Sequence, residues 1–153
     1  MMINSRTVSI VLMLAGFLLA PATASAAPAP APACRVALKA DVDRASFAGT
    51  GRSFTNERLS RIGLATAARF NSVATRLCLA KVVKPRELAA IRTLLVLNGE
   101  GATEPLLYRQ PQADPRALML QYQFADDLAP SAAAIDHALR CWVKPQRAGC
   151  EAD

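Results

Sequence analysis

The sequence predicts an α+β fold, in which a small antiparallel sheet of three or four strands carries a long helix and a C-terminal helix on one face. Two patterns lead to this prediction. Apolar and polar residues alternate in residues 34–43 and again in 117–125, which is the period of a half-buried strand. From residue 56 the apolar spacing changes to steps of three and four residues, which is typical of an amphipathic helix. The expected order of elements is β-α-β-β-β-α.

The first strand of the prediction covers residues 34–43, where the apolar positions from Val36 to Val42 lie on one side. Residues 44–55 hold two glycines and several small hydroxylated residues, so they are expected to form a loop. The Gly49-Thr50-Gly51 stretch within it lacks the lysine and the spacing of a phosphate-binding loop, and a plain turn is the better interpretation.

The long helix is predicted to begin at Asn56, with Thr55 as its N-cap. Its apolar stripe consists of Leu59, Ile62, Thr66, Phe70, Val73 and Leu77, which gives about six turns. Pro85 marks the next break, and one or two further helical turns can follow it.

The second half of the chain is predicted to contribute three strands and a helix. Residues 94–97 and 106–109 read as two strands joined by the turn Asn98-Gly99-Glu100-Gly101, which favours a hairpin. In the last strand, 117–125, Gln121 and Gln123 point away from the apolar side, so that face of the sheet is expected to be solvated or to meet a partner. A final helix is expected after its N-cap Ser131.

The first residues predict export. A basic residue, Arg6, precedes the apolar residues 8–20, and Ala24-Ser25-Ala26 fits the pattern that signal peptidase cleaves. The apolar run is too short to span a bilayer as a helix. We therefore expect residues 1–26 to be a signal peptide, 27–33 an extended Ala/Pro leader, and 34–153 a single domain in the periplasm or outside the cell.

The four cysteines have two interpretations. Exported domains commonly use an even set of cysteines as disulfides, and no pair here has C-x-x-C spacing. If the first strand and the long helix run in opposite directions, Cys34 and Cys78 meet at one end, while Cys141 and Cys150 close the C-terminal tail. The alternative is a zinc site, because His137 and Cys141 lie four residues apart on one helix face.

Catalysis has little support in the sequence. The chain has one histidine, and no serine or cysteine lies in a recognised nucleophile motif. Trp142 is interpreted as a core residue next to the disulfide. We expect a binding or interaction module without cofactor or metal. The alternative is a zinc-binding or hydrolytic enzyme centred on His137 and the cysteines.

Charge gives a candidate binding surface. The formal net charge is +6, and the residues from Arg58 to Arg86 include no carboxylate. Helical spacing places four arginines on or near one flank of the long helix, namely Arg58, Arg61, Arg69 and Arg76. A basic flank on an exported protein fits an acidic envelope component or an acidic protein. Nucleic acid is disfavoured, because no aromatic residues are interleaved with these arginines to stack on bases.

Overall fold

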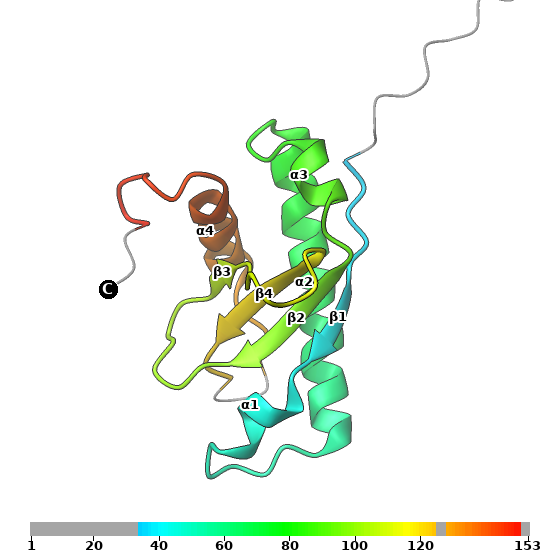
Figure 1. The fold of residues 1–153 in the computed structure, drawn as a ribbon, viewed down its shortest axis with the longest axis vertical. Helices are drawn as coiled ribbons and strands as arrows, with labels where there is room; N and C mark the ends of the chain where they lie inside the picture. Colours follow the sequence, from blue (N-terminus) through cyan, green and yellow to red (C-terminus); the bar gives the residue numbers. More distant parts are fainter. Residues whose placement is uncertain (1–33, 125–127, 151–153) are drawn as a thin grey trace, which may run out of the picture. The chain divides into compact units, whose positions relative to one another are not determined.

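The computed structural model describes residues 34–124 and 128–150, so the predicted signal peptide and leader lie outside the described residues. Figure 1 shows the arrangement of its four strands and four helices. In chain order these are β1 (Lys39–Val42), α1 (Arg44–Ala48), α2 (Asn56–Leu79), α3 (Pro85–Ala89), β2 (Thr93–Asn98), β3 (Leu106–Tyr108), β4 (Ala117–Tyr122) and α4 (Ala132–Val143). The α+β class and the predicted order of the main elements are confirmed.

The sheet is mixed, and the prediction of an antiparallel sheet is wrong. Its strand order is β1-β2-β4-β3. β1 pairs in parallel with β2, and β2 pairs in parallel with β4. Only β3 and β4 are antiparallel. Because β4 lies between β2 and β3, the predicted hairpin of residues 94–97 and 106–109 does not form.

The turn residues that favoured the hairpin bind β4 and the residues after it. The Gly99 N–H donates to the carbonyl of Tyr122 (3.1 Å), and the Asn98 Oδ1 accepts from the N–H of Phe124 (2.9 Å). A Cβ atom on Gly99 would lie 2.6 Å from the Cγ of Gln121, so a larger residue here would force the Gln121 side chain to move. The Asn-Gly pair therefore directs the end of β2 toward β4.

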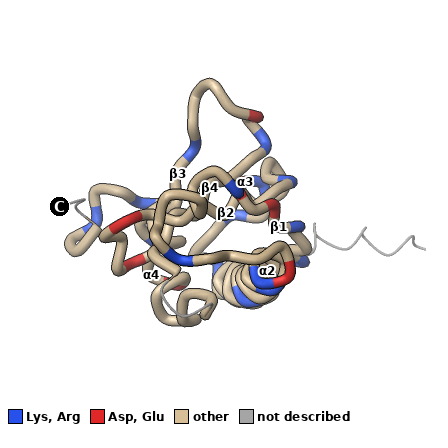
Figure 2. The backbone as a smooth tube through the Cα atoms, turned by 90° about the horizontal axis from the view of Figure 1, so that it is seen from below, with Lys and Arg blue, Asp and Glu red and all other residues tan. Residues whose placement is uncertain are grey.

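The helices α2 and α4 pack against each other and lie on the same side of the sheet, as Figure 2 shows. The sheet residues on that side include two register pairs that are fully buried, Leu94 with Leu118 and Val96 with Leu120. Every residue of the predicted α2 stripe is buried, including Thr66. Ile135 and Leu139 complete the core from α4. Burial of these side chains is the main stabilising term of the fold.

The chain before β1 runs along α2. Strand β1 is shorter than the predicted strand of residues 34–43, because the segment before it bonds to α2 and not to a neighbouring strand. The side chain of Asn71 accepts from the N–H of Leu38 and donates to its carbonyl, both at 2.9 Å. The Val36 N–H donates to the Thr75 hydroxyl (3.3 Å). These side chains take the place of strand partners for an otherwise unpaired segment.

One helix was not predicted. The expected loop of residues 44–55 contains α1, which is capped by the carboxylate of Asp43 accepting from the N–H of Ala45. Phe47 of α1 is buried and its ring lies 5.0 Å from that of Phe54 and 5.6 Å from that of Phe124. The buried ring of Phe47 thus holds α1 in place. This helix has five residues, which is too short to show an apolar period in the sequence.

Disulfides join Cys34 to Cys78 and Cys141 to Cys150, the pairing that the predicted layout favoured. Two disulfides fit a protein that folds in an oxidising compartment. Among the described residues no helix is both long enough and apolar enough to cross a membrane.

Candidate anion-binding groove

Most of the predicted arginine flank is engaged in contacts within the chain. A guanidinium nitrogen of Arg69 donates to the carbonyls of Ala129 (2.8 Å) and Pro130 (2.9 Å), and so anchors the segment that leads into α4. Arg76 forms an ion pair with Asp136 of α4 at 2.9 Å. Both arginines therefore hold α2 to the C-terminal part of the fold.

The other two arginines of the flank, Arg58 and Arg61, differ in their contacts within the chain. Arg58 donates to the carbonyl of Ser53 (2.8 Å), and its guanidinium lies 5.0 Å from the centre of the Phe54 ring. Arg61 is exposed and has no hydrogen bond or ion pair with any residue that the structure describes. The structure does not bring the four arginines together as one free basic surface.

A different set of basic residues gathers at one edge of the sheet. The three parallel strands begin at this edge, where Lys39 is the register partner of Thr93, and Thr93 is that of Ala117. Arg92 and Arg116 directly precede β2 and β4, and the N–H of Arg92 donates to the carbonyl of Arg116 (2.8 Å). Parallel pairing thus aligns basic residues that lie far apart in the sequence.

Beside this edge is a groove of about 670 Å³. Its lining comes from the segment before β1, the end of α2, α3 and the start of β2: Cys34, Arg35, Val36, Ala37, Leu38, Lys39, Cys78, Pro85, Leu88, Ala89, Ile91 and Arg92. Three of these residues are cationic, and none is a carboxylate. We call this site the basic groove.

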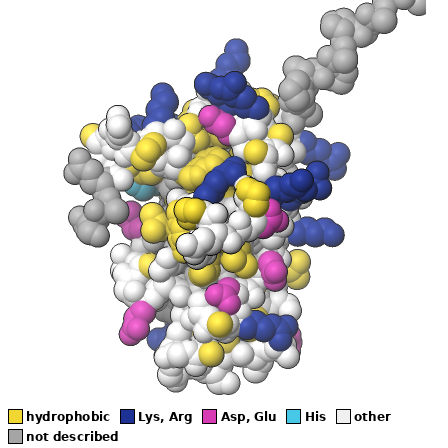
Figure 3. Space-filling model, in the orientation of Figure 1, with side chains coloured by type: hydrophobic (Ala, Val, Ile, Leu, Met, Phe, Trp, Pro, Cys, Tyr) yellow, Lys and Arg dark blue, Asp and Glu magenta, His cyan; other side chains and the backbone are white. Residues whose placement is uncertain are grey.

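The cations of the basic groove are available to a ligand. Arg35, Lys39 and Arg92 are exposed, and none of their side chains has a hydrogen bond or ion pair within residues 34–124 and 128–150. The floor of the groove is apolar, with Leu38 and Ile91 buried. Lys and Arg side chains gather over α3 and the start of β1 in the space-filling view (Figure 3).

The nearest carboxylates in sequence are bound to the backbone. The Oδ1 of Asp41 accepts from the N–H of Val42 (3.0 Å), and the Oδ1 of Asp114 accepts from that of Arg116 (2.8 Å). Glu87 accepts from the N–H of Lys84 (3.0 Å). Each of these carboxylates thus bonds to the backbone close to it in sequence, and none forms an ion pair with a groove cation within the described residues.

The spacing of the groove cations indicates which kind of anionic ligand the groove fits. Arg35 and Lys39 lie four residues apart in the extended segment, which corresponds to roughly 13 Å at the rise of a strand. This spacing matches a row of negative charges along an extended chain, with the apolar floor beneath it.

The sequence did not reveal the basic groove. Arg35 and Lys39 appear as ordinary polar positions of the alternating segment, and Arg92 and Arg116 precede two separate strands. These residues come together only through the parallel pairing of the strands, and the sequence does not show that pairing. The predicted flank was visible because its arginines share one helix.

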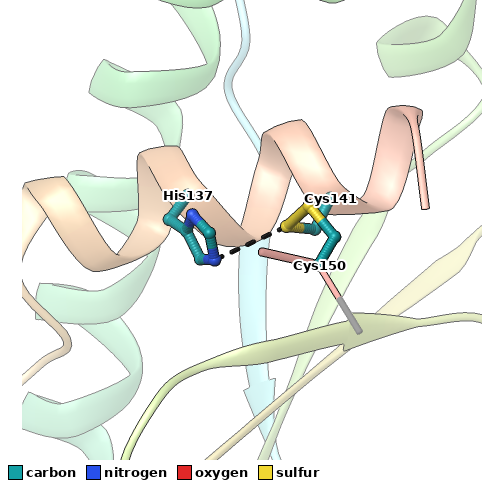
Figure 4. Close-up of side chains that lie close together, drawn as sticks. All are labelled: His137, Cys141 and Cys150. Atoms are coloured by element: carbon teal, nitrogen blue, oxygen red, sulfur yellow. Dashed lines mark hydrogen bonds between the residues drawn. A yellow bond between two sulfur atoms is a disulfide. The ribbon is translucent and has the colours of Figure 1, made fainter. Parts of the chain in front are cut away.

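The predicted cluster of His137, Cys141 and Cys150 does come together. His137 and Cys141 lie on one face of α4, and the His137 Nε2 is 3.6 Å from the Cys141 Sγ, as Figure 4 shows. Both cysteines are in the disulfide, so neither sulfur is a thiolate ligand in this state. The cluster lines a second groove of about 860 Å³ between α4 and residues 101–107.

Trp142 forms part of the wall of this second groove. It is half-buried against the core, and the guanidinium carbon of Arg109 lies 5.8 Å from its ring centre. The sequence predicts Trp142 as a core residue. In the structure Trp142 is only half-buried: it packs against the core and also lines the second groove.

Fold and sites together define a small α+β protein with two disulfides and an open, positively charged groove. No protein-family model matches the chain, and searches of curated proteins and of solved structures find no similar protein.

Proposed function

We propose that this protein is an exported binding module that holds an acidic, extended segment of a partner protein in the basic groove. The lining of that groove carries the proposal, since it combines three unpartnered cations with an apolar floor and no carboxylate. The signal sequence pattern of residues 1–26, with cleavage near Ala26, supports export to the periplasm or beyond. The two disulfides are in keeping with such a compartment.

A protein segment fits this groove better than a membrane surface does. The cations line a hollow over buried leucine and isoleucine, whereas a membrane-bound surface needs apolar side chains that project beyond the basic ones. A peptide with alternating acidic and apolar side chains places its carboxylates on the rim and its apolar groups on the floor. Such a site contributes recognition through charge complementarity and needs no catalytic group.

The test uses a fluorescently labelled polyglutamate probe and measures its binding by anisotropy. The groove variant is Arg35→Gln, Lys39→Gln and Arg92→Gln. The matched control, Arg61→Gln, Lys144→Gln and Arg147→Gln, removes the same number of charges from exposed positions outside the groove. Because each pairing is worth about 0.5 to 1 kcal/mol at the surface, we expect the groove variant to bind roughly 10- to 100-fold more weakly.

The control variant should bind within about threefold of the native protein, and added salt should weaken the binding of both. Equal loss in the two variants would mean that net charge alone attracts the probe, and the groove assignment would then be wrong. Anionic lipid vesicles serve as a competitor. Tighter binding of vesicles than of polyglutamate, lost in the groove variant, would replace the protein partner with a lipid surface.

A further inference from the structure

The second groove contains a cluster whose chemistry the basic groove does not use. Within the part of the chain that the structure describes, His137, Cys141 and Cys150 are the one group of three metal-ligating side chains, with ligand atoms all within 4.8 Å of one another. α4 supplies the first two at a spacing of four residues, which puts them on one face (Figure 4).

The tail after α4 brings the third ligand back to this face. The N–H of Arg147 donates to the carbonyl of Lys144, and that of Cys150 donates to the carbonyl of Arg147, which folds the tail into two consecutive turns. Gly149 has a φ of +83°, a conformation that favours glycine. Residues 144–149 are all exposed, so this segment is free to adjust when the Cys141–Cys150 bond opens.

The geometry matches a tetrahedral zinc ion. With Zn–S distances of about 2.3 Å and Zn–N of about 2.1 Å, the sulfur and nitrogen ligands of a tetrahedral site lie roughly 3.6 Å apart. The Nε2 of His137 and the Sγ of Cys141 are already at 3.6 Å. Metal binding would still require the two sulfur atoms to separate from 2.03 Å and the Cys150 Sγ, which lies within 4.8 Å of the His137 ring nitrogen, to move closer to it. The exposed tail permits both movements.

We propose that the reduced protein binds one Zn²⁺ through His137, Cys141 and Cys150. A dithiol reductant passes two electrons and two protons to the Cys141–Cys150 disulfide and becomes a disulfide itself. Zn²⁺ then displaces the two thiol protons and binds the neutral imidazole through Nε2. The metal replaces the disulfide as the link between α4 and the tail, and its fourth coordination position opens toward the second groove.

The other disulfide does not offer the same site. Cys34 and Cys78 have no histidine beside them, since the chain's one histidine is His137. They line the basic groove together with Arg35, whose charge disfavours a bound cation. Reduction therefore creates a metal site at one end of the molecule only.

The experiment measures Zn²⁺ bound to the purified protein before and after treatment with a phosphine reductant, which does not itself supply thiols. Alkylation and mass measurement give the number of thiols in each sample, and circular dichroism establishes that the reduced protein is folded. We expect one Zn²⁺ per reduced chain and none per oxidised chain. Co²⁺ in place of Zn²⁺ should give the absorption of a thiolate-bound tetrahedral ion.

Two variants assign the ligands. His137→Ala should weaken Zn²⁺ binding by more than about 100-fold, because even the loss of an outer partner of a metal ligand costs roughly 10- to 100-fold. The double variant Cys141→Ser and Cys150→Ser keeps only Cys34 and Cys78 and should bind no Zn²⁺ when reduced. Any one of three results would overturn the proposal: no Zn²⁺ on the folded reduced protein, equal binding by either variant, or equal binding by the oxidised protein.

Discussion

A single side chain, that of Asn71, completes the backbone bonding of the segment before β1. Its amide group donates to the carbonyl of Leu38 and accepts from the N–H of the same residue. Leu38 is 8% exposed, so neither backbone group has ready access to water. An asparagine is suited to this position because its amide carries both a donor and an acceptor, as a neighbouring strand would.

Replacing Asn71 with alanine should lower the free energy of unfolding by about 2 to 3 kcal/mol, since it leaves a buried N–H and a buried carbonyl without partners. Asn71→Asp keeps an acceptor for the Leu38 N–H but places a carboxylate against the Leu38 carbonyl, so it should destabilise the protein as well. Urea denaturation measures both. The neighbouring exposed Ser72 gives the control, and Ser72→Ala should change stability by less than about 0.5 kcal/mol. Equal effects of Asn71→Ala and Ser72→Ala would show that the amide pair has no stabilising role.

Among the elements, the contact between α2 and β1 depends on the buried residue Gly63. A Cβ atom at this position would lie 2.9 Å from the Cγ2 of Val42 and 3.8 Å from the Cβ of Ala40. Glycine within a helix costs about 1 kcal/mol relative to alanine. Its presence here is explained by the close approach of the strand, because the branched side chain of Val42 has little freedom to move aside.

Gly63→Ala should therefore destabilise the native protein by about 1 kcal/mol, because the overlap with Val42 outweighs the gain in helix propensity. In a Val42→Ala background the overlapping Cγ2 is absent. There the same Gly63→Ala change should stabilise the protein by about 1 kcal/mol. A double-mutant cycle by urea denaturation measures this coupling. A zero coupling energy would show that α2 and β1 are not in close contact at this point.

The elements that were predicted well are those with a strong local pattern. Thr55 caps α2 and Ser131 caps α4, each by accepting from the N–H three residues later. Both helices begin directly after these caps, as expected. α1 was missed because its five residues show no apolar period. Its local signal is the Asp43 cap, and its burial depends on aromatic residues elsewhere in the chain.

At the scale of the whole molecule, strand pairing was the feature that local patterns could not supply. The alternation in residues 117–125 indicates which side chains of β4 face the helices. The same alternation would be seen whichever strand pairs with β4, and whether that strand is parallel or antiparallel to it. The seven-residue connection between β2 and β3, residues 99–105, is too long to force a hairpin. Parallel pairing also creates the basic groove, so the candidate site could not be predicted before the pairing was known.

The two disulfides should contribute unequally to the stability of the whole molecule. Cys34–Cys78 spans 44 residues and Cys141–Cys150 spans 9. On a chain-entropy basis these loops correspond to roughly 4 and about 2.7 kcal/mol. Cys78 is also buried at 3% exposure, so Cys34→Ala with Cys78→Ala loses core packing as well. Urea denaturation of the two double variants should give this order, and a reversed order would contradict it.

The two cysteine double variants also distinguish the roles of the two disulfides in binding. Cys34 and Cys78 form part of the wall of the basic groove, and their disulfide holds the segment that carries Arg35 and Lys39 against α2. Cys34→Ala with Cys78→Ala should therefore weaken binding of the polyglutamate probe at urea concentrations where the variant is still folded. Cys141→Ala with Cys150→Ala releases only the exposed tail and should leave that binding unchanged. Equal binding by both folded variants would mean that the disulfide does not position the groove cations.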